Sequence, residues 1–412
     1  MSFLKQISPA HLTGALNGGL RLLSMASRFA LLLILLKNAS PDVVGTYGLL
    51  SASVAFLSLI VGADFYQYAQ RELITQPPSH RSFVLQHQAI VITGLYAVLL
   101  PLSYLAFVLG FLPYDLLLPF LGLSIVEHLG QELGRTLTSM AKPLVAGWVL
   151  FLRTAAWVWL LAVQGDHSIT LNEIIMAWTA GSLSGLALAA FFVYNLTKPW
   201  KRWPLDTAWI QAGLKQALLY FSATVALKGI TTADRYMMQH TSSAEVVGAY
   251  VAYIGIAMTL INLLDASVFS QLYPKLVRHK SSGDNHAYQQ AYRSLRNQTW
   301  VMSILASLLC AIAAPYIFNW AHKPVYIEHL DIFYVIVIAV FFYAVSMVPH
   351  YGLYAERKDV PIVATQILAI LPFSMVFGIL KTSTPDISAA MALTAAFIFT
   401  FIAKEILYRQ GK

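Results

Sequence analysis

The chain has 412 residues, of which 58% are hydrophobic and only 11% are charged. An ordinary soluble domain carries about 25% charged residues, so this composition excludes that class of protein. The net charge of +8 could suggest nucleic-acid binding, but the basic residues lie in short connections between apolar runs. We therefore expect no nucleic-acid partner.

The apolar runs have the length of membrane-spanning helices, which need roughly 20 apolar residues each. The first run carries Arg21 and Arg28 and lacks a small-residue cleavage site, so it predicts a spanning helix, not a signal peptide. Cys310 lies in a later run and has no cysteine partner in the chain. The expected spans, about twelve in chain order, lie near 15–36, 43–63, 88–110, 114–136, 144–164, 171–194, 213–235, 245–268, 299–320, 330–350, 360–380 and 386–407.

The distribution of lysine and arginine predicts the orientation of these spans. If the N-terminus is cytoplasmic, the outer connections carry only Lys37, Lys323 and Lys381, and most of the 27 basic residues lie on the inner side. Cytoplasmic loops of membrane proteins are enriched in basic residues in this way. The pattern predicts that both termini are cytoplasmic.

A short repeat divides the chain into halves. Residues 40–47 read Ser-Pro-Asp-Val-Val-Gly-Thr-Tyr, and residues 243–250 read Ser-Ala-Glu-Val-Val-Gly-Ala-Tyr. Each copy opens the second span of a six-span half, and its glycine permits close helix approach. Because six is even, the halves should be related by an axis along the membrane normal. We expect an N-terminal six-helix bundle over 1–196, a cytoplasmic interfacial linker over 197–212, and a C-terminal six-helix bundle over 213–412.

This layout resembles the polysaccharide-transporter branch of the multidrug/oligosaccharidyl-lipid/polysaccharide (MOP) exporter superfamily, most closely the O-antigen flippases of the Wzx type. The resemblance rests on the repeat and on Ala-Asp-Arg-Tyr-Met-Met at 233–238. It implies an all-α polytopic, MATE-like fold with two bundles around a cavity that opens alternately inward and outward. Lipid II flippases of the superfamily usually carry two further helices, which counts against a peptidoglycan precursor as cargo.

The resemblance also implies a cargo and a location. The cargo would be an undecaprenyl-diphosphate-linked oligosaccharide, flipped across a bacterial inner membrane. Coupling would use H⁺ or Na⁺, with no other cofactor. Partners would be membrane lipids, with a polysaccharide polymerase and a chain-length regulator as further candidates.

Several cations interrupt the expected spans. Arg28 lies in the middle of the first span with Arg21 on roughly the same face, Arg153 lies in the fifth, and Lys228 lies deep in the seventh. Each costs about 2.5 to 3.5 kcal/mol at a helix centre, so none should face lipid. One hypothesis is a cationic cavity for a diphosphate, because arginine presents a fork to phosphate oxygens. The alternative is pairing with acids on other helices.

Acidic residues and a histidine interrupt the fourth and seventh spans. Glu127 and His128 could bind the coupling ion, or Glu127 could neutralise Arg28 or Arg153. Asp234 and Arg235 end the seventh span as a gate or as a structural pair. Glu132 and Arg135 are expected to form a surface pair.

We found no catalytic motif, cofactor motif or metal-ligand set in the sequence, so we expect a transporter and not an enzyme. Two alternatives to the flippase remain. A multidrug or small-cation antiporter of the same fold should have an acidic, aromatic pocket. A membrane-embedded polymerase or glycosyltransferase should need a larger outer loop than this chain offers.

Overall fold

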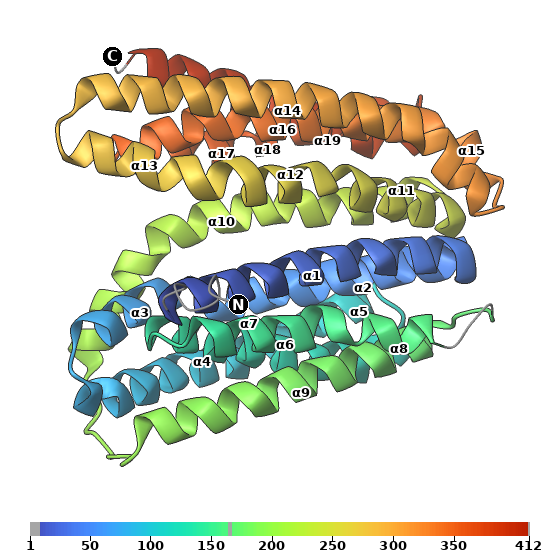
Figure 1. The fold of residues 1–412 in the computed structure, drawn as a ribbon. Coiled ribbons are helices and arrows are strands. Elements are labelled where there is room, and N and C mark those ends of the chain that lie inside the picture. The colour runs from blue at the N-terminus through green and yellow to red at the C-terminus, as the bar shows by residue number, and fades with distance from the viewer. Residues whose placement is uncertain (1–8, 164–166, 411–412) are drawn as a thin grey trace, which may run out of the picture. The chain divides into compact units, whose positions relative to one another are not determined.

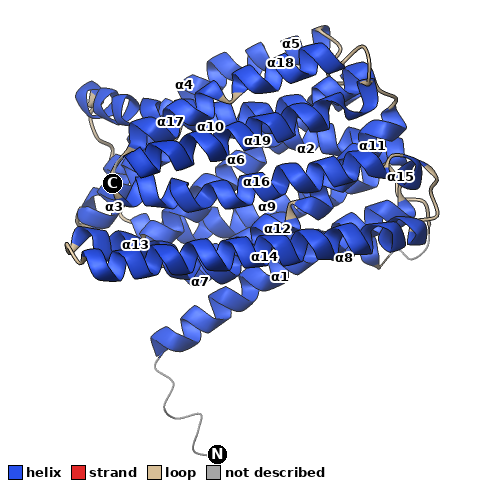
Figure 2. Ribbon diagram, turned by 90° about the horizontal axis from the view of Figure 1, so that it is seen from above, coloured by secondary structure: helices blue, strands red, loops and turns tan. Residues whose placement is uncertain are grey.

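The computed structural model describes residues 9–163 and 167–410, and within them every regular element is a helix (Figures 1 and 2). The prediction of an all-α polytopic protein is therefore confirmed. The N-terminal helices are α1 (Pro9–Asn38), α2 (Pro41–Gly62), α3 (Tyr66–Thr75), α4 (Arg81–Ser103), α5 (Leu105–Val108), α6 (Leu117–Ser139), α7 (Pro143–Phe151), α8 (Val158–Ala162) and α9 (Leu171–Thr197). The later helices are α10 (Thr207–Thr241), α11 (Ala244–Ala257), α12 (Thr259–Leu264), α13 (Ser270–Ser281), α14 (Asn285–Trp320), α15 (Val325–Glu328), α16 (Leu330–Ala355), α17 (Asp359–Leu368), α18 (Ile370–Leu380) and α19 (Pro385–Gln410).

Ten helical stretches among the described residues are long and apolar enough to cross a membrane. Two further predicted spans, near 114–136 and 213–235, fall on α6 and α10. These helices have 23 and 35 residues, so they are long enough to span, but ionisable residues interrupt both of them. The twelve predicted spans thus all coincide with helices, and the two most polar of them carry most of the candidate site residues.

Helix α14 is longer than expected. A span beginning near residue 299 was predicted, whereas one helix of 36 residues begins at Asn285. The Asp284 side chain accepts a hydrogen bond from the Ala287 amide, 2.9 Å away, and caps its first turn. The sequence from Asn285 to Ala314 contains no glycine or proline, so nothing ends the helix where the span was expected to begin.

The helices group into two compact units. Unit 1 takes in the described residues of Met1–Ile34 and Leu50–Phe221, and unit 2 takes in those of Leu35–Leu49 and Ser222–Lys412. The segment 197–212, predicted as a linker between halves, belongs to unit 1. The turn between α1 and α2 belongs to unit 2, although it lies near the start of the sequence.

In unit 1, side chains of α4 anchor the connection between α9 and α10. The Gln86 amide accepts from the Trp203 backbone N–H at 3.0 Å and donates to the Trp203 carbonyl at 2.7 Å. The Asp206 backbone N–H donates to His87 Nε2 at 2.9 Å. Trp209 packs against Phe83, with ring centroids 5.5 Å apart. The connection is therefore a fixed part of unit 1.

In unit 2, the two copies of the sequence repeat lie against each other. A Cβ atom on Gly45 would lie 3.0 Å from the Gly248 nitrogen, and one on Gly248 would overlap the Pro41 carbonyl. Lys323 donates to the Leu36 carbonyl at 2.7 Å and also to the Ala39 carbonyl, which satisfies the carbonyl end of α1. The α1–α2 turn is thus packed into unit 2 by residues far away in the sequence.

Candidate functional site

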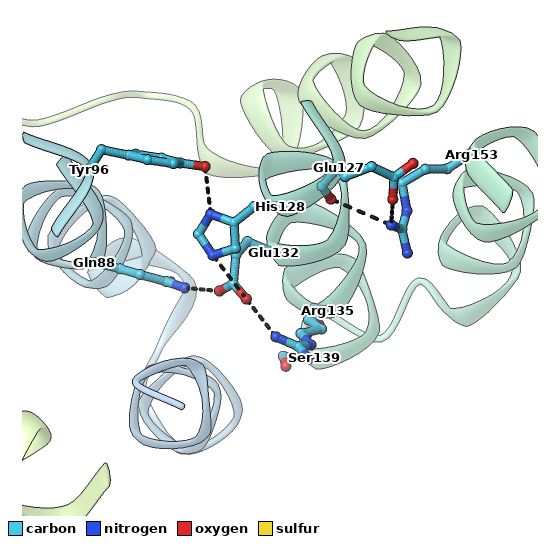
Figure 3. Close-up of polar contacts among 8 residues, drawn as sticks. All are labelled: Gln88, Tyr96, Glu127, His128, Glu132, Arg135, Ser139 and Arg153. Carbon is cyan, nitrogen blue, oxygen red and sulfur yellow. Dashed lines mark hydrogen bonds and ion pairs between the residues drawn. The ribbon is translucent and has the colours of Figure 1, made fainter. Parts of the chain in front are cut away.

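Helix α6 carries two buried polar clusters in unit 1, shown in Figure 3. Glu127 points toward Arg153, whereas His128 and Glu132 point toward Gln88 and Tyr96 on α4. Buried charges are expensive unless they are paired and hydrogen-bonded. The partners of each group therefore decide what each cluster can do.

The first cluster is an ion pair between Glu127 Oε2 and Arg153 Nη1, whose side chains are 11% and 12% exposed. The other carboxylate oxygen, Oε1, accepts from Trp178 Nε1 at 2.8 Å and from Ser182 Oγ at 2.5 Å. Both oxygens of Glu127 are thus held by α9 and by the segment that carries Arg153. This is the interhelical pairing that the sequence left open as an alternative for both residues.

Local backbone structure makes room for this ion pair. Arg153 lies in a π-helical turn, Leu152–Ala156, between α7 and α8. Glycines face it on both sides: a Cβ on Gly130 of α6 would lie 2.9 Å from Arg153 Cδ, and one on Gly185 of α9 would lie 3.1 Å from Arg153 Cβ. Real Cβ atoms are rarely that close, so the two glycines permit the arginine to run between α6 and α9.

The second cluster centres on His128, which is 1% exposed. Its Nδ1 lies 2.7 Å from the Tyr96 hydroxyl. Its Nε2 lies 4.0 Å from Glu132 Oε1 and makes no hydrogen bond to any described residue. Because a tyrosine hydroxyl can donate or accept, the ring can carry its proton on either nitrogen. His128 thus has one ring nitrogen without a hydrogen bond to a described residue, with a carboxylate oxygen 4.0 Å away.

Glu132 is the anionic partner in this cluster and is only 4% exposed. Gln88 Nε2 donates to its Oε2 at 2.7 Å, and Arg135 Nη1 donates to its Oε1 at 2.6 Å. The Arg135 guanidinium lies 3.7 Å from the centroid of the Tyr66 ring. The expected pair of Glu132 with Arg135 is present, but Glu132 is buried and not at the surface, because α4 and the start of α3 cover that part of α6.

The turn between α2 and α3 is strained beside this cluster. Ala63 and Asp64 have φ values of 45° and 51°, in the left-handed region that non-glycine residues rarely adopt. A Cβ on the preceding Gly62 would lie 3.3 Å from His128 Nε2. Asp64 is only 5% exposed, so this turn is buried next to the cluster. Strain of this kind gathers at functional sites.

Comparison with solved structures gives the fold. An inward-facing multidrug resistance MATE family transporter of the MOP superfamily has a TM-score of 0.74 and 10% identity, covering 96% of this chain and 94% of that one. The lipid II flippase MurJ in an inward closed conformation has a TM-score of 0.73 and 12% identity, covering 97% of this chain and 87% of that one. The fold is that of MOP superfamily transporters.

A third neighbour is a MOP superfamily transporter from Pyrococcus furiosus, with a TM-score of 0.63 and 10% identity, covering 97% of this chain and 95% of that one. No protein-family model matches the sequence, and no curated protein is significantly similar to it. At these identities the likeness shows the MOP fold alone. The named neighbours are transporters or flippases, not enzymes.

The other three cations that the sequence analysis singled out are exposed on the surfaces of their helices. Arg21 and Arg28 are exposed on α1 in unit 1. Lys228 is exposed on α10 in unit 2 and makes no ion pair with a described residue. These three side chains are therefore exposed, whereas the Arg153 side chain is only 12% exposed.

Asp234 and Arg235, predicted as a gate or a structural pair, interact locally within unit 2. Asp234 is 1% exposed and accepts from the Tyr250 hydroxyl at 3.0 Å and from the Arg235 backbone N–H at 2.8 Å. The Arg235 guanidinium lies 3.7 Å from the same carboxylate. The contacts tie the end of α10 to α11.

The sequence analysis did not predict one buried lysine in unit 2. Lys404 falls within the predicted span near 386–407 and was not named as a candidate, but α19 carries it into unit 2, where it is 1% exposed. Its Nζ lies 3.4 Å from His350 Nδ1 on α16. The available signal was the position of Lys404 within an apolar helix, before the exposed Arg409.

Proposed function

We propose that this protein moves an undecaprenyl-diphosphate-linked oligosaccharide from the inner to the outer leaflet of a bacterial inner membrane by alternating access. The observation that carries the proposal is the exposure of Arg28 and Lys228 in the middle of long helices. A cation at that depth costs about 2.5 to 3.5 kcal/mol in lipid, so such a side chain belongs on an aqueous path.

The acids on α6 and α10 support an anionic cargo. Glu127, Glu132 and Asp234 are each held by a cation together with hydrogen-bond donors, so their charges are compensated. Asp265 is exposed, but it lies in the π-helical segment between α12 and α13, nearer the predicted cytoplasmic end. An excess of exposed positive charge favours a diphosphate and disfavours a cationic drug.

Two structural neighbours show that proteins of this fold are not confined to multidrug transport. MurJ is a lipid II flippase, so the fold can move a lipid-linked substrate. The Pyrococcus furiosus transporter is described as having a binding pocket of reverse polarity that suggests a different function. A surface polysaccharide polymerase and a chain-length regulator would be the protein partners in this role.

Reconstitution distinguishes this proposal from the multidrug alternative. Proteoliposomes would be loaded either with a fluorescent undecaprenyl-diphosphate oligosaccharide or with ethidium, each with an imposed gradient of H⁺ or Na⁺. We expect protein-dependent transfer of the lipid-linked sugar between leaflets, with no change in its mass, and no ethidium transport. Ethidium transport without sugar transfer would assign the antiporter function, and a change in sugar mass would assign a transferase.

We propose that coupling to the ion gradient uses the His128–Glu132 pair, because His128 Nε2 makes no hydrogen bond to a described residue and lies 4.0 Å from Glu132 Oε1. Glu132→Gln retains a hydrogen-bond acceptor for Gln88 but removes the charge that a proton would neutralise. We expect this variant to fold and to lose the part of transport that responds to an imposed proton gradient. Glu72→Gln, on α3 of the same unit, serves as the control. A gradient response equal to that of the unmodified protein would refute the assignment.

A further inference from the structure

The anchored connection between α9 and α10 borders a pocket that the transport proposal does not use. The pocket has a volume of about 630 Å³ and lies entirely in unit 1. One wall is the exposed, largely apolar face of α4, formed by Ala89, Ile90 and Thr93. Trp200, Lys201 and Arg202 form the other wall.

The charged residues that line the pocket are all positive. Lys201 and Arg202 are exposed, and neither makes an ion pair with a described residue. None of the described residues that line the pocket has a carboxylate. Lys198, by contrast, is already engaged: its Nζ donates to Asn195 at 3.2 Å and lies over the Tyr194 ring. The pocket therefore offers two uncompensated cations beside an apolar surface.

These cations sit on a rigid support. Gln86 holds both backbone groups of Trp203, directly after Arg202, and Trp203 Nε1 donates to Ser82 Oγ at 3.0 Å. Arg81 Nη1 donates to the Leu196 carbonyl at 3.0 Å on the other side of the segment. Because the backbone is fixed before any ligand arrives, little ordering entropy opposes binding.

We propose that this pocket binds an anionic glycerophospholipid of the surrounding bilayer. The headgroup phosphate would contact Lys201 and Arg202, Trp200 would lie at the headgroup level, and an acyl chain would follow Ile90 along α4. Tryptophan prefers the membrane interface, and basic residues near a bilayer surface attract anionic lipid. The pocket lies at the end of unit 1 that the lysine and arginine distribution predicts to be cytoplasmic.

The experiment uses the full chain in nanodiscs of equal phosphatidylglycerol and phosphatidylcholine, followed by native mass spectrometry of the released protein. We expect retained phosphatidylglycerol. The double variant Lys201→Gln with Arg202→Gln should retain about thirty-fold less, because each basic residue near the surface contributes about 1 kcal/mol. The matched control, Arg71→Gln with Lys215→Gln, removes two exposed charges elsewhere in unit 1 and should retain the lipid normally.

A second variant tests the geometry and not only the charge. Gln86→Leu keeps both cations but releases the Trp203 backbone, so we expect weaker retention of phosphatidylglycerol by a protein that still folds, with a lower unfolding midpoint. Equal retention by the Lys201/Arg202 double variant and the unmodified protein would overturn the proposal. So would displacement of phosphatidylglycerol by inorganic phosphate, or preferential retention of added undecaprenyl phosphate, since either would assign the pocket to another source of phosphate.

Discussion

Arg153→Ala is expected to lower the amount of folded protein strongly. The change leaves the Glu127 carboxylate inside unit 1 with only the Trp178 and Ser182 donors. Removing one partner of a buried ion pair costs about 3 to 5 kcal/mol, because the remaining charge is left uncompensated. Thermal unfolding of the purified protein and its abundance in membranes would both report this loss.

A second substitution at Glu127 should restore the abundance that Arg153→Ala loses. Adding Glu127→Gln to Arg153→Ala removes the uncompensated charge while the amide oxygen still accepts from Trp178 and Ser182. We expect the double variant to recover most of the abundance. Arg21→Ala removes an exposed cation from the same unit and serves as the control for charge alone. Normal abundance of Arg153→Ala would contradict a structural role for the pair.

Arg28→Ala is expected to leave protein abundance unchanged and to reduce surface polysaccharide by about ten- to hundred-fold. Hydrogen bonds to charged groups contribute about 1.5 to 3 kcal/mol, which corresponds to that range of rates if Arg28 contacts the diphosphate in transit. Arg28→Lys should be partly active, because it keeps the charge but loses the bidentate fork. Lys228→Ala should have an effect in the same direction.

The measurement pairs long-chain surface polysaccharide with protein level in cells that lack the native gene. Arg71→Ala removes an exposed arginine from α3, outside the candidate spans, and should leave polysaccharide unchanged. Normal polysaccharide and normal abundance in both Arg28→Ala and Lys228→Ala would refute the cationic path. Loss of abundance in either variant would instead indicate a structural role for that cation.

Hydropathy was sufficient to predict most of the helical fold, because ten of the twelve predicted spans are long apolar runs. It could not predict that 197–212 is anchored to α4, since that depends on Gln86 and His87, over 100 residues away. Nor could it predict where α14 begins, because polar residues without a helix breaker can continue a spanning helix beyond its apolar part. Local pattern determines which residues are helical, whereas long-range contacts determine which segments are fixed.

The candidate site was predicted only in part, for a related reason. Pairing of Glu127 with Arg153 was one of the alternatives weighed, because a charge inside an apolar span needs a partner. Glu132 was expected nearer the surface from its position along α6, but its burial depends on α3 and α4. Lys404 was not named as a candidate, because it lies near the end of its predicted span. The position of a residue along a helix predicts its depth in the membrane. It does not predict whether neighbouring helices bury its side chain.

The packing of the α1–α2 turn into unit 2 has a consequence for the order of events during synthesis. Residues 35–49 leave the ribosome early, but Gly248 and Lys323, which pack against this turn, follow roughly 200 or more residues later. At about 5 to 20 residues per second, the delay is about 10 s at the least. During that interval the carbonyl end of α1 lacks its lysine and Gly45 lacks its partner helix. The N-terminal part of this protein therefore cannot complete its packing until most of the C-terminal part has been made.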